Sequence, residues 1–287
     1  MGEGRWVADW EQVIGRDLVP HLVADEQPEC VHRPAGLPRL PAGAHADLSA
    51  CVGRIDLENV LIVPAAAWRW DKWRRLSLYM PLSVAAIGER GAALWVHAPP
   101  APGVRIQVLF SDIAAVEQHH DGAWRVLVVT ARSSQLVVRY HQDADACVDM
   151  WSRHLRLRAA AVAVPVPPAC TGRTARRGAA ELGSLLLSSD DGIVSAGTSK
   201  RSGLFAVTSR ELIVVQALRA RRRPWHRATR TLYVPRLAIE EAVVRAKSVW
   251  LRSAGTAMRA RLSSPKVSAA ASAWLSQLLS DRTGAGS

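Results

Sequence analysis

Two long stretches of this chain carry the same order of short apolar segments, and this internal duplication restricts the fold more than any other feature. Residues 84–155 predict several strands followed by one amphipathic helix, and residues 204–279 predict the same order again. The repeat is as long as a whole domain, whereas solenoid repeats are about 20–50 residues long. We therefore expect two copies of a small β-rich module, each closed by a helix.

The two copies agree in pattern rather than in identity. The aligned pairs are 83–90 with 203–210 and 110–117 with 234–241. In the second pair only Ala114 with Ala238 and Glu117 with Glu241 are identical, although apolar character agrees at the flanking positions. Chance similarity between two β-rich stretches is the alternative explanation.

Composition favours an ordinary globular protein. The length of 287 residues is typical of about two domains, and 49% hydrophobic with 22% charged residues is close to the usual globular balance. No stretch approaches the ~18 apolar residues that a membrane span requires, and the first residues lack the features of a secretory signal. The four cysteines, Cys30, Cys51, Cys147 and Cys170, form no paired motif, so we expect reduced thiols and a cytoplasmic protein.

The net charge of +12 is confined to one half of the chain. Residues 1–158 hold 17 Arg and Lys against 18 Asp and Glu, whereas residues 159–287 hold 20 against 7. Such asymmetry indicates an anionic partner for the second half and says little about its fold.

Periodicity and breakers give a domain plan. Trp6, Trp10, Val13 and Ile14 follow helical spacing, while three prolines between residues 165 and 168 interrupt regular structure. The predicted segments are an N-terminal amphipathic helix (1–24), an irregular Pro- and Gly-rich tether (25–55), a first domain (56–158), a linker (159–180), a second, basic domain (181–281) and a flexible tail (282–287).

The expected strands of the two domains can be placed from alternation and turn signals. They are 57–63, a strand from Leu82, 94–96, 104–108, 113–118, 124–130 and 136–140 in the first domain, and 204–207, 211–216, 232–234, 243–245, 249–252 and 258–262 in the second. A helix from about Asp143 closes the first domain, and a helix with Ser264 as N-cap and Pro265 behind it closes the second. Their apolar faces contain Trp151 and Trp274.

This pattern resembles the bacterial pleckstrin-homology-like (PH-like) domains, related to the GRAM branch of that superfold. The resemblance rests on the turn at residues 207–210, the strands with acidic ends at 113–117 and 237–241, and the single closing helix. It implies an α+β fold of two partly closed antiparallel β-barrels, with an extra N-terminal helix. Trp151 and Trp274 would plug the two barrels. The family implies binding of lipid headgroups or of protein, with neither catalysis nor a cofactor.

The strongest local feature is an arginine-rich segment between two predicted strands of the second domain. Its residues are Arg219, Arg221, Arg222, Arg223, Trp225, Arg227 and Arg230. Guanidinium groups bind phosphate bidentately, and a tryptophan beside them suits a membrane interface or stacking on a base. A solvated loop, rich in arginine because of a GC-rich genome, is the alternative interpretation.

A second basic and aromatic cluster lies in the first domain. It comprises Trp68, Trp70, Lys72, Trp73, Arg74 and Arg75. These residues are a secondary candidate for lipid contact, although packing of the tryptophans against the domain is the favoured interpretation, because this chain has 11 tryptophans and only 2 phenylalanines.

Metal and catalytic sites are not predicted. Cys30, His32, His45 and Cys51 match no standard zinc spacing, and His119 and His120 would point to opposite faces of a strand. No phosphate-binding glycine loop, nucleophile elbow or HExxH sequence is present in the chain.

The sequence therefore favours a non-enzymatic tandem PH-like adaptor. The second domain would bind an anionic membrane surface or an acidic protein through the arginine-rich segment, at the inner face of the membrane in the first case. A nucleic-acid-binding protein that uses the same arginines, and a purely structural interaction module, remain as alternatives. The sequence does not predict the oligomeric state.

Overall fold

The structure is a computed structural model. It describes residues 43–64, 82–97, 103–121, 124–161, 182, 185–187, 193–199, 203–219, 227–245, 248–261, 272 and 275.

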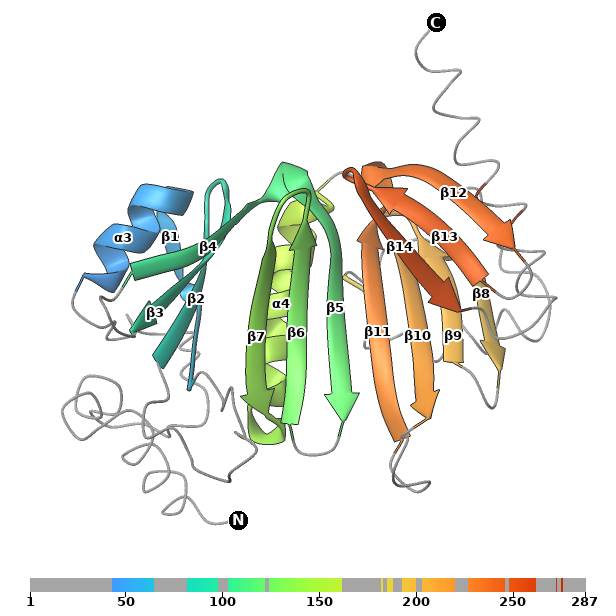
Figure 1. The fold of residues 1–287 in the computed structure, drawn as a ribbon, viewed down its shortest axis with the longest axis horizontal. Helices are drawn as coiled ribbons and strands as arrows, with labels where there is room; N and C mark the ends of the chain where they lie inside the picture. Colours follow the sequence, from blue (N-terminus) through green and yellow to red (C-terminus); the bar gives the residue numbers. More distant parts are fainter. Residues whose placement is uncertain are drawn as a thin grey trace, which may run out of the picture. The chain divides into compact units, whose positions relative to one another are not determined.

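Antiparallel β-structure dominates the described residues, together with two α-helices (Figure 1). The helices are α3 (Ala44–Val52) and α4 (Asp145–Ala159). The strands are β1 (Ile55–Pro64), β2 (Leu82–Gly88), β3 (Gly91–His97), β4 (Gly103–Leu109), β5 (Ile113–Asp121), β6 (Trp124–Ala131), β7 (Gln135–His141), β8 (Ile193–Ser199), β9 (Gly203–Thr208), β10 (Glu211–Arg219), β11 (Arg227–Pro235), β12 (Ile239–Arg245), β13 (Ser248–Ser253) and β14 (Thr256–Arg261). The predicted β-rich, α+β composition is confirmed, and none of the described sheets closes into a barrel.

The chain forms two compact units. Unit 1 comprises Met1–Phe110, Ala123–Val128 and Ser134–Leu155, and unit 2 comprises Ser111–Gly122, Val129–Ser133 and Arg156–Ser287. Strand β5, which we expected in the first domain, belongs to unit 2 because it pairs antiparallel with β11, from Val116 opposite Tyr233 to His120 opposite Thr229.

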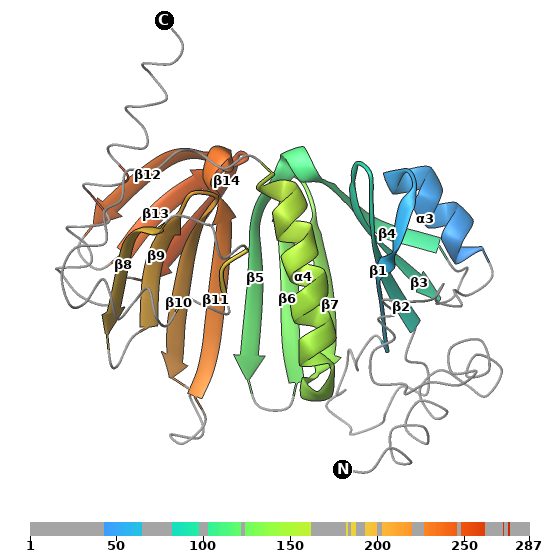
Figure 2. The same ribbon diagram turned by 180° about the vertical axis from the view of Figure 1, so that it is seen from behind.

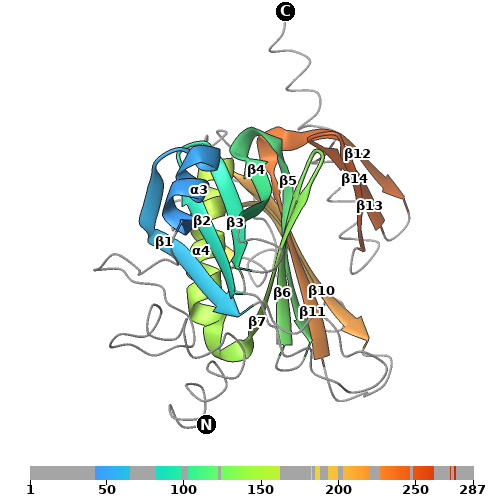
Figure 3. The same cartoon turned by 60° about the vertical axis from the view of Figure 1, so that its left-hand side comes forward.

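Unit 1 contains the four-stranded sheet β1-β2-β3-β4. Helix α3 packs on this sheet against β2, β3 and β4 (Figure 3). It lies within residues 25–55, where we expected an irregular tether. Its buried residues Ala44, Leu48 and Val52 recur every four positions, so one face of a short helix turns toward the sheet. Helix α4 lies along β6 and β7 (Figure 2), and Trp151 is fully buried there.

Unit 2 contains consecutive strands β5-β11-β10-β9-β8 and the separate sheet β12-β13-β14. Strand β8 was not predicted, because its small and polar residues give little β-signal beyond Ile193 and Val194. Apolar side chains from β9, β10, β11, β12, β13 and β14 form one core. Leu275 joins this core with only 2% of its surface exposed, whereas Trp274 lies outside the described residues.

Matching backbone hydrogen bonds relate the two halves of the chain. The amide of Phe110 donates to the carbonyl of Arg90, as Arg236 does to Arg210; the amide of Arg132 donates to Asp112, as Ala254 does to Ala238. In each half, four strands lead through a 3-10 turn into three more strands. These turns are η1 (Phe110–Asp112) and η4 (Arg236–Ala238).

These bonds test the alignment of the two copies. The predicted match of Arg90 with Arg210 is confirmed, because each follows β2 or β9 in a two-residue turn. The second aligned pair is displaced by two residues, since Ile113 follows η1 and Ile239, not Leu237, follows η4. The segment from β10 to β11 (211–235) is six residues longer than the segment from β3 to β4 (91–109).

Candidate functional site

The predicted arginine-rich site lies on the hairpin of β10 and β11. The strands pair without interruption from Glu211 opposite Pro235 to Arg219 opposite Arg227. Residues 220–226, which hold Arg221, Arg222, Arg223 and Trp225, lie outside the described residues, as do the side chains of Arg219 and Arg227. The described backbone therefore fixes the base of the hairpin and places two arginines on its last rung.

Arg230 is the one predicted site residue whose side-chain contacts the structure describes. Its Nε donates to Oε2 of Glu117 at 2.8 Å, and its Nη2 donates to Oε1 at 2.7 Å. His119 Nε2 lies 3.0 Å from Oε2 of the same carboxylate. Arg230 thus joins β11 to β5 through a bidentate ion pair, which is the strong form of this contact.

The environment of Glu117 strongly favours its ionised form. Burial alone would raise the pKa of Glu117, but the hydrogen bonds and charges of His119 and Arg230 outweigh burial and lower this pKa to about 2. Near neutral pH the carboxylate therefore compensates the charge of Arg230. The remaining arginines of the predicted site lie nearer the hairpin tip.

A turn at the opposite end of the hairpin holds the end of α4. The Thr208 hydroxyl donates to the Glu211 carbonyl at 3.1 Å and accepts from the amides of Arg210 and Glu211, so it fixes the β9–β10 turn. Arg210 Nη1 then donates to the carbonyl oxygens of Ala160 at 3.0 Å and Ala161 at 2.8 Å. We use the name helix-end clamp for this contact, in which an arginine of a two-residue turn binds two successive carbonyls at or just after the end of the preceding helix.

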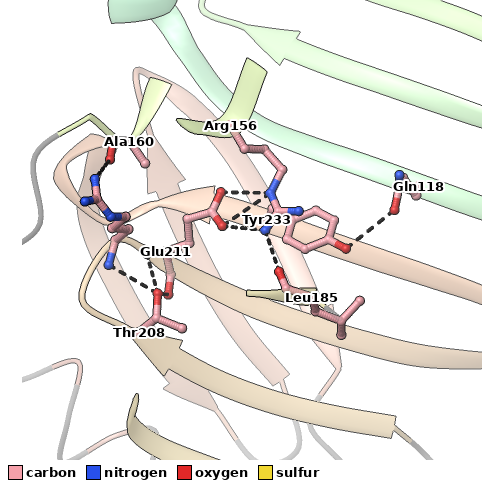
Figure 4. Close-up of polar contacts among 8 residues, drawn as sticks. Gln118, Arg156, Ala160, Leu185, Thr208, Glu211 and Tyr233 are labelled. Carbon is pink, nitrogen blue, oxygen red and sulfur yellow. Dashed lines mark hydrogen bonds and ion pairs between the residues drawn. The ribbon is translucent and has the colours of Figure 1, made fainter. Parts of the chain in front are cut away.

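Beside the clamp lies a buried ion pair (Figure 4). The guanidinium of Arg156 donates from Nε and Nη2 to the carboxylate of Glu211, with a shortest distance of 2.7 Å. Only 6% and 1% of these side chains are exposed. Nη2 also donates to the Leu185 carbonyl at 2.8 Å, and the guanidinium lies 3.4 Å from the ring centroid of Tyr233. These contacts satisfy the charges inside the protein, so the pair has a structural role.

The same clamp recurs in unit 1. Arg90 Nη2 donates to the carbonyl oxygens of Ala50 at 3.2 Å and Cys51 at 3.0 Å, at the end of α3. The Gln107 amide donates to Cys51 at 2.8 Å, and the Trp95 indole donates to the Asp47 carboxylate at 2.9 Å. Arg90 and Arg210 were aligned in the sequence, but their shared role was not predicted, because an irregular tether rather than a helix was expected directly before β1.

An exposed apolar pair on unit 2 was also missed. Val243 on β12 and Trp250 on β13 are cross-strand neighbours, and 48% and 47% of their surfaces are exposed. Arg259 on β14 continues the row, with its guanidinium 4.9 Å from the ring centroid of Trp250. Consecutive apolar residues in β12 and β13 hid this second apolar face, because the sequence does not show which of them point outward.

Metal-binding and membrane-spanning features are not seen in the described part of the chain. No group of three or more His, Cys, Asp or Glu residues there is arranged to hold a metal ion. None of its helices combines the length and apolarity needed to cross a bilayer. The secondary candidate cluster, which comprises Trp68, Trp70, Lys72, Trp73, Arg74 and Arg75, lies outside the described residues.

Comparisons with protein families, with curated proteins and with solved structures find no match to this chain.

Proposed function

We propose that this chain is a non-catalytic binding protein of two PH-like repeats, and that its second repeat binds an anionic phospholipid surface through the β10–β11 hairpin. The hairpin residues assigned to this role are Arg219, Arg221, Arg222, Arg223, Trp225 and Arg227, while Arg230 anchors the base through Glu117.

The repeated order of elements supports the PH-like interpretation. Each half has four strands, a 3-10 turn and three further strands, linked by the same backbone hydrogen bonds. Helix α4 follows the first set and buries Trp151. Leu275, in the segment where the second closing helix is predicted, is buried in the core of unit 2, and this supports the same interpretation.

The observation that carries the binding proposal is the last rung of the hairpin. Arg219 lies opposite Arg227 in the backbone register, and like charges directly opposite each other destabilise an antiparallel pair. Three further arginines follow within the seven-residue tip. Phosphate groups would relieve this repulsion, since each accepts two hydrogen bonds from a guanidinium. Trp225 would enter the headgroup region, where amphipathic rings are favoured.

Vesicle binding tests the proposal. Full-length protein is sedimented with phosphatidylcholine vesicles and with vesicles that also contain phosphatidylglycerol. Binding is expected only with the anionic lipid. Each basic residue near such a surface contributes on the order of 1 kcal/mol, so Arg221→Ala, Arg222→Ala and Arg223→Ala together should weaken binding by about 3 kcal/mol, or roughly a hundredfold.

A matched control distinguishes a specific effect of the hairpin arginines from an effect of net charge. Arg54→Ala, Arg132→Ala and Arg245→Ala remove the same charge from exposed positions elsewhere and should leave most binding intact. Equal losses in the two triple variants would remove the hairpin from the proposal. A parallel titration with duplex DNA addresses the nucleic-acid alternative: binding to DNA without binding to anionic vesicles would favour that alternative.

A further inference from the structure

Within unit 2, two elements from the first half of the chain support the four-strand segment of the second half. Strand β5 pairs along β11 and holds it through Glu117 and Arg230. The end of α4 is held by the helix-end clamp at Arg210. The second repeat thus receives a fifth strand, β5, and the end of a helix, α4, from the repeat before it.

In the second repeat, the strand that corresponds to β5 does not support a further sheet of the described residues in this way. Strand β12 follows η4 as β5 follows η1, so β12 is the counterpart of β5. It forms one side of the sheet β12-β13-β14, and no described strand pairs with its outer edge. An unpaired edge is a template for another strand.

The equivalent acceptor edge lies in the first repeat. Strand β4 precedes η1 as β11 precedes η4, and it ends the sheet β1-β2-β3-β4. Among the described residues, β7 lies close to β4, and the Ser134 hydroxyl donates to the Gln107 carbonyl of β4 at 3.3 Å. Strand β4 therefore has the same place in the first repeat as β11 has in the second, and β11 is the strand that pairs with β5.

Side chains at equivalent positions suit this pairing. Counted from η1 and η4, Val243 is the counterpart of Glu117, and Ile106 is the counterpart of Leu232, the residue opposite Glu117. A pairing of β12 with β4 in the same register would set Val243 opposite Ile106. Val243 is about half exposed and Ile106 is partly exposed, so both would bury apolar surface in such a contact.

Helix α3 already occupies the helix-end clamp of the first repeat. Arg90 holds Ala50 and Cys51 as Arg210 holds Ala160 and Ala161. The approach is close, because a Cβ at Gly88 would lie 2.6 Å from the Val52 side chain and carbonyl. Helix α3 thus occupies the place at Arg90 that the last helix of a preceding repeat occupies at Arg210.

We infer that β12 and β4 are the two ends of a head-to-tail association between copies of this chain, and that α3 is a cap that blocks it. The partner of β12 is the first repeat of a second copy, and its docking requires α3 to leave the clamp at Arg90. This inference does not depend on the proposed lipid binding. A contact of this kind joins two different surfaces, so it can extend beyond a dimer.

Gly88→Ala in the full-length chain tests the inference, because the added methyl group collides with α3. Light scattering coupled to gel filtration, across low to high micromolar concentrations, should give a monomeric mass for the parent protein. The variant should show a concentration-dependent rise in mass of roughly twofold or more. Gly103→Ala is the matched control, because a Cβ there meets nothing within 4 Å, and it should remain monomeric.

A second substitution tests the strand edge. Val243→Lys adds a charge to the outer strand, which disfavours pairing of edges, and in the Gly88→Ala background it should restore the monomer. Val137→Lys, at a similarly exposed valine on β7, should not. Association that persists with Val243→Lys would contradict the assigned edge.

A milder change covers the case in which Gly88→Ala prevents folding. Arg90→Ala removes the two hydrogen bonds that the exposed Arg90 side chain gives to the end of α3, and it should produce weaker association in a chain whose circular dichroism is unchanged. If neither Gly88→Ala nor Arg90→Ala self-associates, the inference is wrong.

Discussion

Arg90 and Arg210 occupy the same turn in the two halves of the chain, and each donates hydrogen bonds to two successive carbonyl oxygens at the end of the helix that precedes its sheet. A cation at this place also opposes the negative end of the helix dipole. The two helices differ in length, with 9 residues in α3 and 15 in α4, so the turn, rather than the helix, is the repeated element.

Loss of the helix-end clamp should destabilise the chain unequally. Arg210 is partly buried and Arg90 is exposed, and charged hydrogen bonds are stronger where water competes less. We expect Arg210→Met to lower the free energy of unfolding by about 1–3 kcal/mol and Arg90→Met by about 1 kcal/mol or less. Urea unfolding measures both values. Arg132→Met, at another exposed arginine, is the control; an equal effect at all three positions would contradict the clamp.

Replacing one partner of the buried ion pair should lower the free energy of unfolding more than replacing both partners. Glu211→Leu leaves the Arg156 guanidinium buried without its carboxylate and should cost about 3–5 kcal/mol. Arg156→Met leaves the Glu211 carboxylate in the same position. The double variant removes both charges, and apolar replacements of similar size are often near neutral.

A double-mutant cycle from urea unfolding gives the coupling between the two residues. The double variant should be more stable than Glu211→Leu alone. Additive losses, with no coupling between Arg156 and Glu211, would show that the pair is not formed in solution.

Acid should weaken the contact between β5 and β11. The pKa of Glu117 falls from 4.5 to about 2 in the folded protein, so its stabilising effect is present above pH 4.5 and is lost as the pH falls toward 2. Partial exposure of this carboxylate limits the effect to about 2–3 kcal/mol.

Glu117→Gln isolates this contribution. The free energy of unfolding of the parent protein should fall more steeply between pH 4.5 and pH 2 than that of the variant, measured by denaturant titration at each pH. Parallel curves for the two proteins would mean that Glu117 does not have a lowered pKa.

Gly91 should tolerate no side chain. A Cβ at this position would lie 2.0 Å from the Val108 carbonyl oxygen and 2.9 Å from the Leu109 Cα, and backbone atoms of a paired strand cannot move aside cheaply. We expect Gly91→Ala to cost about 3 kcal/mol or more. Gly103→Ala serves as the control in thermal unfolding, and equal stability of the two variants would mean that β3 and β4 do not approach in this way.

Strand positions were largely predictable, because apolar alternation and turn residues are local properties. Thirteen of the fourteen described strands overlap predicted ones. The pairing of β5 with β11 was not predictable in the same way. It joins residues more than a hundred positions apart, and the ion pair of Glu117 and Arg230 has no local signal.

In the candidate site, too, the local features were predictable and the long-range contacts were not. A run of arginines between two strands marks the β10–β11 hairpin in the sequence, and the observed register places Arg219 and Arg227 at its last rung. The sequence did not indicate that Arg230 is bound by Glu117. An arginine that faces solvent and an arginine paired with a carboxylate far away in the sequence have no local sequence difference. Exposure of Trp250 was hidden for a related reason, since tryptophan is also this chain's main large core residue.

The bond between Arg156 and Glu211 closes a loop that spans 55 positions of the chain. Because the two ends are held by their own contacts, the docking of α4 on the β9–β10 turn does not depend on the number of residues between them. Even a doubling of that loop would cost only about 0.6 kcal/mol in closure entropy. The docking of α4 on the β9–β10 turn should therefore be nearly insensitive to the length of the chain that connects α4 to β8.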